Sequence, residues 1–418
     1  MKIWLINPYG PIPSEAWRDY SFSIFGKYLA EQGHEVVWWT SNFSHHFKTF
    51  RSKGFSEIEV CPGFTVKLIP TTGYKKNIGF GRIIRDWVFA GRMYLAGRKE
   101  LAPDLILYSE SMLCLGVAGP ALSKYHNCAL VYDQMDLWPE LMVENVPGYL
   151  RPLLQVLLQP VYYARKKVFD RLDGVMALAK PYLDFAIDVS PSLVNGPKVV
   201  VYNGIDVVDF RQKMSLPPSL DLKKLSENCD VKVVFAGSLG PSYDIQNIID
   251  VAEMIEDAKL SVSILIAGDG PMRGAVEEAE RRLSCLRYFG KLAPLDLCGL
   301  YRICDIGLAA YGPSSNVEMP DKFYDYTAAG LGTICSLQGE VMSQIADFDC
   351  GIAYVAGDVS SLLDAIKSLA SSQETLARVK NNAQQCANEF SSTHQNIKLD
   401  RFLQEVMQQF NDNENGKM

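Results

Sequence analysis

Short runs of apolar residues alternate along the first half of the chain with longer segments in which apolar residues recur at helical spacing. One of these segments predicts a helix over Tyr20–Gln32 that ends at Gly33, a residue type common after helix C-termini. Repeated strand–helix units of this kind predict a parallel sheet with helices on both faces. The runs of strand length are Ile3–Ile6, Glu35–Thr40, Thr65–Ile69, Asp104–Tyr108, Ala129–Tyr132, Gly174–Leu178 and Lys198–Tyr202.

The alternation pauses after residue 202, where Asn203-Gly204 is a strong turn signal and a polar, proline-containing stretch follows. We therefore expect an α/β protein with a Rossmann-like domain over residues 1–202, a linker over 203–230 and a second Rossmann-like domain over 231–395. Residues 396–418 are expected to form a helix, at about Asn396–Phe410, that packs back on the first domain and ends in a polar tail. The strands expected in the second domain are Val231–Ala236, Ser261–Ala267, Arg287–Phe289, Ile306–Ala309, Thr333–Ser336 and Ile352–Val355.

The composition suits two globular domains and narrows the classes of function. Of the 418 residues, 48% are hydrophobic and 21% are charged, and the net charge of −7 disfavours a nucleic-acid-binding protein. The ten cysteines are scattered without zinc spacing, so we expect reduced thiols and no metal. The first apolar run is too short for a signal peptide, and no run is long enough to span a bilayer. These features predict a cytoplasmic protein that needs no metal or other cofactor.

The segment Pro320–Gly330 carries the most informative chemistry. Because it follows an expected strand, it lies at the edge of the sheet where doubly wound α/β proteins bind ligands. Pro320 suits the first turn of a helix, whose N–H groups attract phosphate, and Lys322 adds a full positive charge there. Asp325, about one turn further on, could accept hydrogen bonds from ribose hydroxyls. The residue types alone fit a cradle for a nucleoside diphosphate and an ordinary capped helix about equally well.

This segment resembles the PxKxxEYxAAG stretch of retaining GT-B glycosyltransferases of the large family-four type, with Asp325 in place of the usual Glu. The resemblance implies the GT-B fold, with two facing Rossmann-like domains and a cleft between them, and a nucleoside-diphosphate-sugar donor used without a metal. It implies that Lys322 contacts the diphosphate and that Asp325 contacts the ribose. The family usually has another acidic residue eight positions earlier, where this chain has Val317. Glu318 takes that role if the loop is shifted by one residue.

Three further stretches resemble the donor domain of this family in their order and spacing: Val234–Gly240, Ala267–Pro271 and Phe289–Leu292. Glycine in such loops lets backbone N–H groups approach a phosphate, and the last loop flanks the nucleotide base in the family. The basic pair that often follows the first loop is replaced here by Ser242-Tyr243-Asp244, so Lys322 and then Arg273 are the candidates for neutralising phosphate charge. The donor contacts so implied are Gly10, Gly237, Ser238, Leu239, Tyr243, Gly268, Gly270, Arg273, Lys291, Leu292, Glu318, Lys322 and Asp325.

Two stretches in the first half are candidates for the acceptor side. The loop Asn7–Pro13 leaves the first strand, and in this family it approaches the donor phosphates and the acceptor. The stretch Asp133–Glu140 resembles the DLWPE stretch of bacterial polysaccharide-building members. Its Asp136 either orients an acceptor hydroxyl, as a catalytic residue beside Lys322, or merely caps the next helix. The candidate acceptor-side contacts are Tyr9, Glu15, Arg18 and Asp136.

Together the resemblances imply transfer of a hexose, with retention of anomeric configuration, from a nucleoside-diphosphate sugar to a glycan or a lipid-linked acceptor. No covalent nucleophile is evident, and the family picture is a front-face substitution in which the protein stabilises charge and positions the reactants. Two alternatives stay open. A non-hydrolysing nucleotide-sugar epimerase should bring more carboxylates and histidines, and a catalytically silent subunit should lose the pair formed by Lys322 and Asp325. The missing glycine fingerprint disfavours a dehydrogenase.

Peripheral contact with the inner membrane, at its cytoplasmic face, is a separate hypothesis. Leu150–Phe169 and Arg82–Phe89 mix apolar with basic residues, as do segments that lie on an anionic bilayer. Amphipathic helices that cover a sheet show the same pattern more often, so the sequence leaves both interpretations in place.

Overall fold

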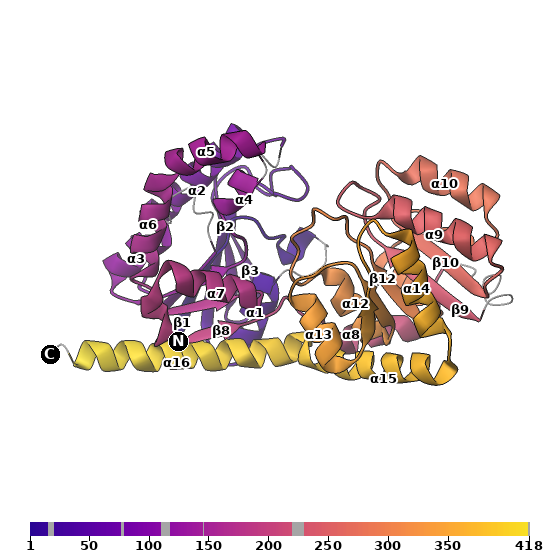
Figure 1. Ribbon diagram of the computed structural model, residues 1–418. Coiled ribbons are helices and arrows are strands. Elements are labelled where there is room, and N and C mark those ends of the chain that lie inside the picture. The colour runs from indigo at the N-terminus through magenta and orange to yellow at the C-terminus, as the bar shows by residue number, and fades with distance from the viewer. Residues whose placement is uncertain (16–20, 77–78, 110–117, 145, 220–229, 417–418) are drawn as a thin grey trace. The chain divides into compact units, whose positions relative to one another are not determined.

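The computed structural model describes residues 1–15, 21–76, 79–109, 118–144, 146–219 and 230–416 (Figure 1). It divides the chain into two compact units, each built around its own sheet. Unit 1 comprises Met1–Asn203 with Asn396–Met418, and unit 2 comprises Gly204–Gln395. No helix among the described residues is long and apolar enough to cross a membrane.

The sheet of unit 1 has the strand order β3-β4-β2-β1-β5-β6-β7-β8, and every pair is parallel except β3 with β4. The sequence predicted all of these strands except β3. Polar residues alternate along β3 with Ile58 and Val60, because an antiparallel edge strand can leave one face in water. The strands are β1 (Lys2–Ile6), β2 (Glu35–Ser41), β3 (Ser56–Cys61), β4 (Phe64–Ile69), β5 (Leu105–Tyr108), β6 (Ala129–Gln134), β7 (Gly174–Ala177) and β8 (Lys198–Val200).

Helices pack on both faces of this sheet, and each face has its own hydrophobic core. Phe22, Phe25 and Leu29 of α1 enter one core, while Phe89 and Met93 of α2 enter the other. The helices of unit 1 are α1 (Ser21–Glu31), α2 (Phe80–Gly97), α3 (Ala118–His126), α4 (Glu140–Glu144), α5 (Arg151–Leu157), α6 (Gln159–Phe169), α7 (Lys180–Val189) and α16 (Ser392–Asn415), with shorter 3-10 turns η1 (Pro13–Glu15), η3 (Gly148–Leu150) and η4 (Pro191–Val194).

The C-terminal helix α16 is part of the core of unit 1. Leu399, Phe402, Leu403 and Val406 are buried in the same core as α1. Their spacing of three and four residues places them on one face of the helix, which is the pattern expected of a helix that covers a sheet.

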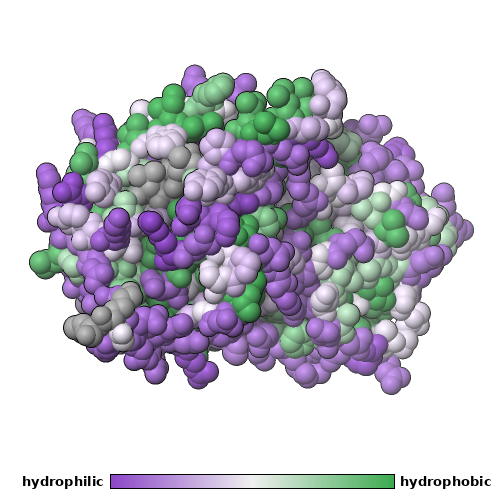
Figure 2. All heavy atoms as spheres, turned by 60° about the vertical axis from the view of Figure 1, so that its left-hand side comes forward, coloured by the Kyte–Doolittle hydropathy of each residue, from purple (hydrophilic) through white to green (hydrophobic). Residues whose placement is uncertain are grey.

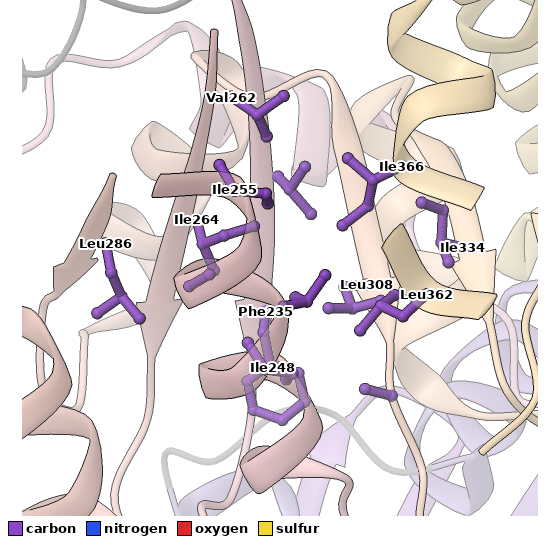
Figure 3. Packing of buried hydrophobic residues seen from close by; sticks show 14 of the residues in the cluster. Phe235, Ile248, Ile255, Val262, Ile264, Leu286, Leu308, Ile334, Leu362 and Ile366 are labelled. Atoms are coloured by element: carbon purple, nitrogen blue, oxygen red, sulfur yellow. The ribbon is translucent and has the colours of Figure 1, made fainter. Parts of the chain in front are cut away.

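Unit 2 contains a parallel sheet of order β11-β10-β9-β12-β13-β14. Figure 3 shows its core, in which side chains of α9 and α14 meet those of the strands, as Ile248 and Leu362 meet Phe235 and Leu308. The strands are β9 (Val231–Ala236), β10 (Val262–Ala267), β11 (Leu286–Tyr288), β12 (Ile306–Ala309), β13 (Gly332–Cys335) and β14 (Gly351–Ala353). The helices are α8 (Val207–Ser215), α9 (Ile245–Asp257), α10 (Arg273–Arg282), α11 (Pro294–Arg302), α12 (Asp321–Ala329), α13 (Glu340–Phe348), α14 (Val359–Ala370) and α15 (Gln373–Glu389).

The expected linker over residues 203–230 is wrong in its first part, because residues 207–215 form helix α8 within unit 2. The Asp206 carboxylate caps this helix by accepting a hydrogen bond from the backbone N–H of Asp209 at 2.9 Å. Phe210 is buried and stacks on Tyr301 of α11, with ring centroids 6.2 Å apart. Some of the polar residues that suggested a linker, among them Asp209 and Gln212, lie on the exposed face of α8.

Candidate functional site

The strand order of unit 2 changes direction at β9, which has β10 on one side and β12 on the other. The pairing of β9 with β12 stops at Gly307, so the two strands separate toward their carboxyl ends. Doubly wound sheets bind ligands at such a point, because loops from the two strands leave in opposite directions. The loops after β9 and β12 and the start of α12 are therefore the first place to look for chemistry.

Tyr326 of α12 joins the separating strands. Its hydroxyl donates a hydrogen bond to the Leu308 carbonyl at 3.2 Å and lies 3.4 Å from the backbone N–H of Ala236, which donates to it. Its ring covers Gly307, where a β-carbon would lie 2.2 Å from the ring. Tyr326 thus fixes the middle of α12 against the ends of β9 and β12.

Helix α12 begins where the sequence predicted. Pro320 is its N-cap in extended conformation, and Gly330 ends it in the left-handed region with φ of +71°. Five residues of the helix besides Lys322 are buried: Phe323, Tyr324, Tyr326, Thr327 and Ala328. A helix so enclosed on most of its sides holds its N-terminus in one place, which is what a fixed anion site needs.

Lys322 is the charged side chain at the centre of this region, and it is only 8% exposed. Its Nζ lies over three aromatic rings, 4.4 Å from the centroid of Tyr243, 5.1 Å from that of Phe235 and 5.9 Å from that of Tyr311. Burial lowers the pKa of Lys322 to about 8, although Asp325 and Asp321 act in the opposite direction. The structure therefore holds a desolvated ammonium group against an aromatic wall, where an anion would stabilise it.

Gly237, directly after β9, makes room for this ammonium group. Its φ is +156°, and a β-carbon at this position would lie 2.1 Å from Lys322 Nζ. The glycine loops after β9, β10 and β11 are also tied to one another. The N–H of Gly237 donates to Ala267, and the N–H of Gly268 donates to Gly290. A β-carbon on Gly268 would lie 1.8 Å from the Gly237 carbonyl oxygen, so glycine is required for this packing as well.

Some of the other predicted donor residues pack against Lys322 or within the glycine loops, and the others lie at the surface. Asp325 is half-buried on α12, and Tyr243 contacts Lys322 and Tyr311. Gly268 and Gly270 belong to the interlocked loops, with Gly270 packed against Leu239. The exposed members are Ser238 after β9, Lys291 after β11 and Arg273 at the start of α10, and Leu292 is half-buried.

Three predicted donor contacts have other roles in the structure. The Leu239 side chain is fully buried in the core, its N–H donates to Asp269 and its carbonyl accepts from Met272. Arg273 Nε pairs at 2.7 Å with Glu277, one turn along its own helix. The Glu318 carboxylate accepts a hydrogen bond at 2.8 Å from the N–H of Glu340 and so caps α13.

In unit 1 the loop after β1 brings Tyr9 into a buried cluster of charged and aromatic groups. The Tyr9 hydroxyl donates to the Asp86 carboxylate at 2.5 Å, and the guanidinium of Arg85 lies 4.3 Å from the centre of the Tyr9 ring. Arg85 is fully buried and also forms an ion pair with Asp86. Arg82 lies over both Tyr9 and Trp138, at 4.8 and 5.2 Å.

The same cluster contains His45 and Tyr74, which the sequence did not predict as site residues. The His45 ring lies edge-on to Tyr9, and its Nδ1 is hydrogen-bonded to the Tyr74 hydroxyl. Burial and the cations Lys48, Arg82 and Arg85 lower the pKa of His45 to about 3, so the ring is neutral. The sequence signal for this cluster lay in Arg82–Phe89, which suggested a membrane segment. Arg85 and Asp86 of this segment face the buried cluster, whereas Ile84 and Trp87 are exposed.

The remaining acceptor-side candidates are placed as follows. Both oxygens of Glu15 bind Arg51, at 3.0 and 2.7 Å, and Arg51 also donates to the Gly10 carbonyl, so Glu15 and Gly10 hold the loop after β1 in shape. Asp136 lies in the loop after β6, where burial raises its pKa while a hydrogen bond with Trp138 and the charge of Arg82 lower it. Arg18 lies outside the described residues.

Asp133, at the end of β6, is a titratable group that the sequence did not single out. It is 2% exposed, and burial together with the charge of Asp136 raises its pKa to about 8. At neutral pH Asp133 therefore carries a proton. Among the residues that the structure describes, no group of three or more His, Cys, Asp and Glu side chains is arranged to hold a metal ion.

Comparison with known proteins identifies a family for each half of the chain. Residues 24–209 match the model of Glycosyltransferase Family 4, and residues 221–386 match that of Glycosyl transferases group 1. Among curated proteins, none matches the chain closely enough to count as a relative.

Solved structures resemble the chain over nearly its whole length. A sucrose-phosphate synthase from Thermosynechococcus elongatus has 15% identity and a TM-score of 0.68, and the match covers 97% of this chain and 98% of that one. HepE from Anabaena, solved in complex with UDP-glucose, has 16% identity and a TM-score of 0.63, over 97% and 99% of the two chains. An α,α-trehalose 6-phosphate synthase from Burkholderia multivorans has 13% identity and a TM-score of 0.70, over 100% and 98%.

Proposed function

Because this chain belongs to the GT-B glycosyltransferases of the family-four type, which use nucleotide-sugar donors, we propose that it transfers a hexose to a glycan or a lipid-linked acceptor with retention of anomeric configuration. The two alternatives suggested by the sequence, an epimerase and a catalytically silent subunit, are not favoured by the comparisons, since both family models describe glycosyltransferases.

The observation that carries the proposal is the position of Lys322. An ammonium group that is almost fully buried, with its pKa lowered to about 8, is costly unless an anion joins it. Lys322 lies in the first turn of α12, whose backbone N–H groups add to its attraction for an anion, and the glycine at the start of the loop after β9 leaves room beside its ammonium group. A diphosphate fits this combination of a full charge and backbone donors.

We assign the chemical roles as follows. The bond between the anomeric carbon and the diphosphate oxygen breaks, and the acceptor oxygen forms its new bond on the same face of the sugar. The acceptor proton passes to the departing diphosphate oxygen. Lys322 and the N-terminus of α12 stabilise the charge that grows on the diphosphate, which is the kind of assistance that a fixed oxyanion site provides. Asp325 accepts hydrogen bonds from the ribose hydroxyls.

UDP-sugars are the first donors to test. The structures of HepE contain UDP or UDP-glucose, and the trehalose-6-phosphate enzyme from E. coli was solved with UDP-2-fluoro glucose. On the acceptor side, a pocket of about 600 Å³ in unit 1 is lined by Asn42, Ser52 and Thr71 beside the exposed ring of Phe50, and its lining also includes the basic residues Arg51, Lys53 and Arg92. Hydroxyl-binding groups beside an aromatic ring suit a sugar, which supports a glycan-containing acceptor.

The proposal is tested by incubating the protein with UDP-glucose and related donors, together with soluble glycans or polyprenyl-diphosphate-linked sugars. The expected result is a glycoside whose anomeric configuration, measured by the proton NMR coupling constant, equals that of the donor. Lys322→Ala should lower turnover by about 10²-fold or more, by analogy with the loss of one oxyanion donor. Lys367→Ala, which changes an exposed helical lysine of the same unit, is the matched control. An inverted product, donor conversion without an acceptor, or unchanged turnover in Lys322→Ala would refute the assignment.

A further inference from the structure

Helix α5 exposes its apolar side chains to solvent. Of its seven residues none is buried, although four of them are leucine or valine. Leu153, Val156 and Leu157 are 59%, 67% and 66% exposed, and their spacing places them on one face. An amphipathic helix normally turns this face inward, so α5 presents the face that other helices of the protein bury.

The apolar surface continues on both sides of α5. Tyr149 precedes it and is 81% exposed, and Tyr163 of α6 is 67% exposed. Leu158, between the two helices, is buried and anchors the segment to unit 1. We call the surface formed by the exposed residues of 149–171 the α5 surface. Figure 2 shows hydrophobic residues gathered along the upper edge of the molecule, at the height that α5 has in Figure 1.

Most charged residues of this segment are basic, whereas the chain as a whole has a net negative charge. Residues 149–171 include five Lys or Arg and a single acidic residue, Asp170, whereas the chain as a whole carries a net charge of −7. Arg165 is buried and paired with Glu140, at 2.7 Å. The four exposed basic residues are Arg151, Lys166, Lys167 and Arg171, of which Lys166 is paired with Asp170 at 3.0 Å.

The geometry points to an anionic lipid bilayer as the partner of the α5 surface. Leu153, Val156 and Leu157 would enter the boundary between headgroups and acyl chains. The basic residues at the end of α6, where Lys167 lies over the ring of Tyr163, would contact headgroup phosphates. Tyr149 and Tyr163 have the amphipathic rings that concentrate at such a boundary. A second copy of the chain fits less well, because a symmetric interface through this surface would set its basic residues against their own copies.

The experiment is flotation of the purified protein with vesicles of phosphatidylcholine, with and without phosphatidylglycerol, in the absence of nucleotide. Binding is expected only to the anionic vesicles, and it should weaken as salt rises because the basic residues contribute about fivefold each. The triple variant Leu153→Ser, Val156→Ser, Leu157→Ser should lower the partition coefficient at least roughly tenfold. Because these side chains are exposed, its melting temperature should not fall.

A matched control removes the same kind of exposed side chain elsewhere. The triple variant Leu101→Ser, Val208→Ser, Val355→Ser changes residues that are 77%, 77% and 60% exposed, and it should float like the wild type. Absence of binding to anionic vesicles, equal binding by wild type and the α5 variant, or an equal loss in the control variant would overturn the inference. A dimer, seen by light scattering, that the α5 variant dissolves would assign the surface to self-association instead. Because the assay contains no donor, its outcome is independent of the proposed transferase activity.

Discussion

Replacing Lys322 by methionine should make unit 2 more stable while it removes donor binding. The wild-type side chain holds a positive charge in a nearly closed aromatic environment, and methionine keeps the aliphatic volume without the charge. A residue that lowers the stability of the empty protein is expected where the function needs a desolvated charge. The variant therefore tests whether Lys322 is held for a ligand or for the fold.

The magnitude follows from the pKa. Burial lowers it from 10.5 to about 8, and at about 1.4 kcal/mol for each tenfold change the buried ammonium group costs the fold about 3 kcal/mol. The nearby rings of Tyr243 and Phe235 offset part of this cost, since a cation over an aromatic face gains about 0.5–2 kcal/mol. A net gain of about 1–2 kcal/mol remains for Lys322→Met at pH 7, or roughly 2–8 °C in the melting temperature of a unit of this size.

The gain should depend on pH in a definite direction. Below pH 8 lysine is charged in both the folded and the unfolded state, so the full cost is present. Between pH 8 and 10.5 the folded protein binds fewer protons than the unfolded one, so the stability of the wild type rises toward that of the variant. Thermal melts at pH 7 and pH 10, with Lys367→Met as control, measure this. A destabilised Lys322→Met variant, or a gain that is equal at both pH values, would refute the reasoning.

Three further predictions concern the same region of unit 2. Asp325→Ala should weaken the binding of UDP about tenfold or more in calorimetry, as expected for loss of a charge-assisted hydrogen bond, and leave the binding of inorganic diphosphate unchanged. Equal losses of affinity for both ligands would show that Asp325 does not contact the ribose. Gly237→Ala should destabilise the protein by more than about 1 kcal/mol in urea denaturation and abolish donor binding, because the added β-carbon would lie 2.1 Å from Lys322 Nζ. The control Gly274→Ala has open space around it and should be neutral or stabilising by up to about 1 kcal/mol, so similar effects at both sites would argue against the packing described. Tyr326→Phe should lower the free energy of unfolding by about 1–3 kcal/mol in urea denaturation, because it leaves the Leu308 carbonyl of β12 and the Ala236 N–H of β9 without the hydroxyl that joins them. An unchanged free energy of unfolding would mean that the hydroxyl does not join the strands.

The sequence predicted the fold well because this fold depends on apolar periodicity. Central strands such as β1 and β9 are buried on both faces and appear as continuous apolar runs. The edge strand β3 was missed, since Glu57 and Glu59 face water and a short alternating segment resembles a loop. Helix α8 was missed because its mean hydropathy is low and its polar residues, together with nearby prolines, suggested a linker.

The candidate site was predictable where one segment carries several groups and not where the fold assembles groups from distant segments. Pro320 and Lys322 share one helix start, so a single segment made an anion site one of two interpretations of the sequence, and the structure places both residues at the start of α12. The aromatic wall around Lys322 comes from β9 and the segments that follow β9 and β12, which no local pattern connects. Likewise, Tyr9, His45 and Arg85 meet only after three segments of unit 1 pack together.

The most direct test of the account is a calorimetric titration of the wild type, Lys322→Met and Asp325→Ala with UDP, GDP, ADP and dTDP. The wild type should bind one of these nucleotides, and Lys322→Met should lose this binding although its fold is at least as stable. Asp325→Ala should bind this nucleotide at least about tenfold more weakly while it binds inorganic diphosphate as the wild type does. Binding of none of the nucleotides by the wild type, or equal affinity in Lys322→Met, would contradict the claim that the start of α12 holds the donor diphosphate.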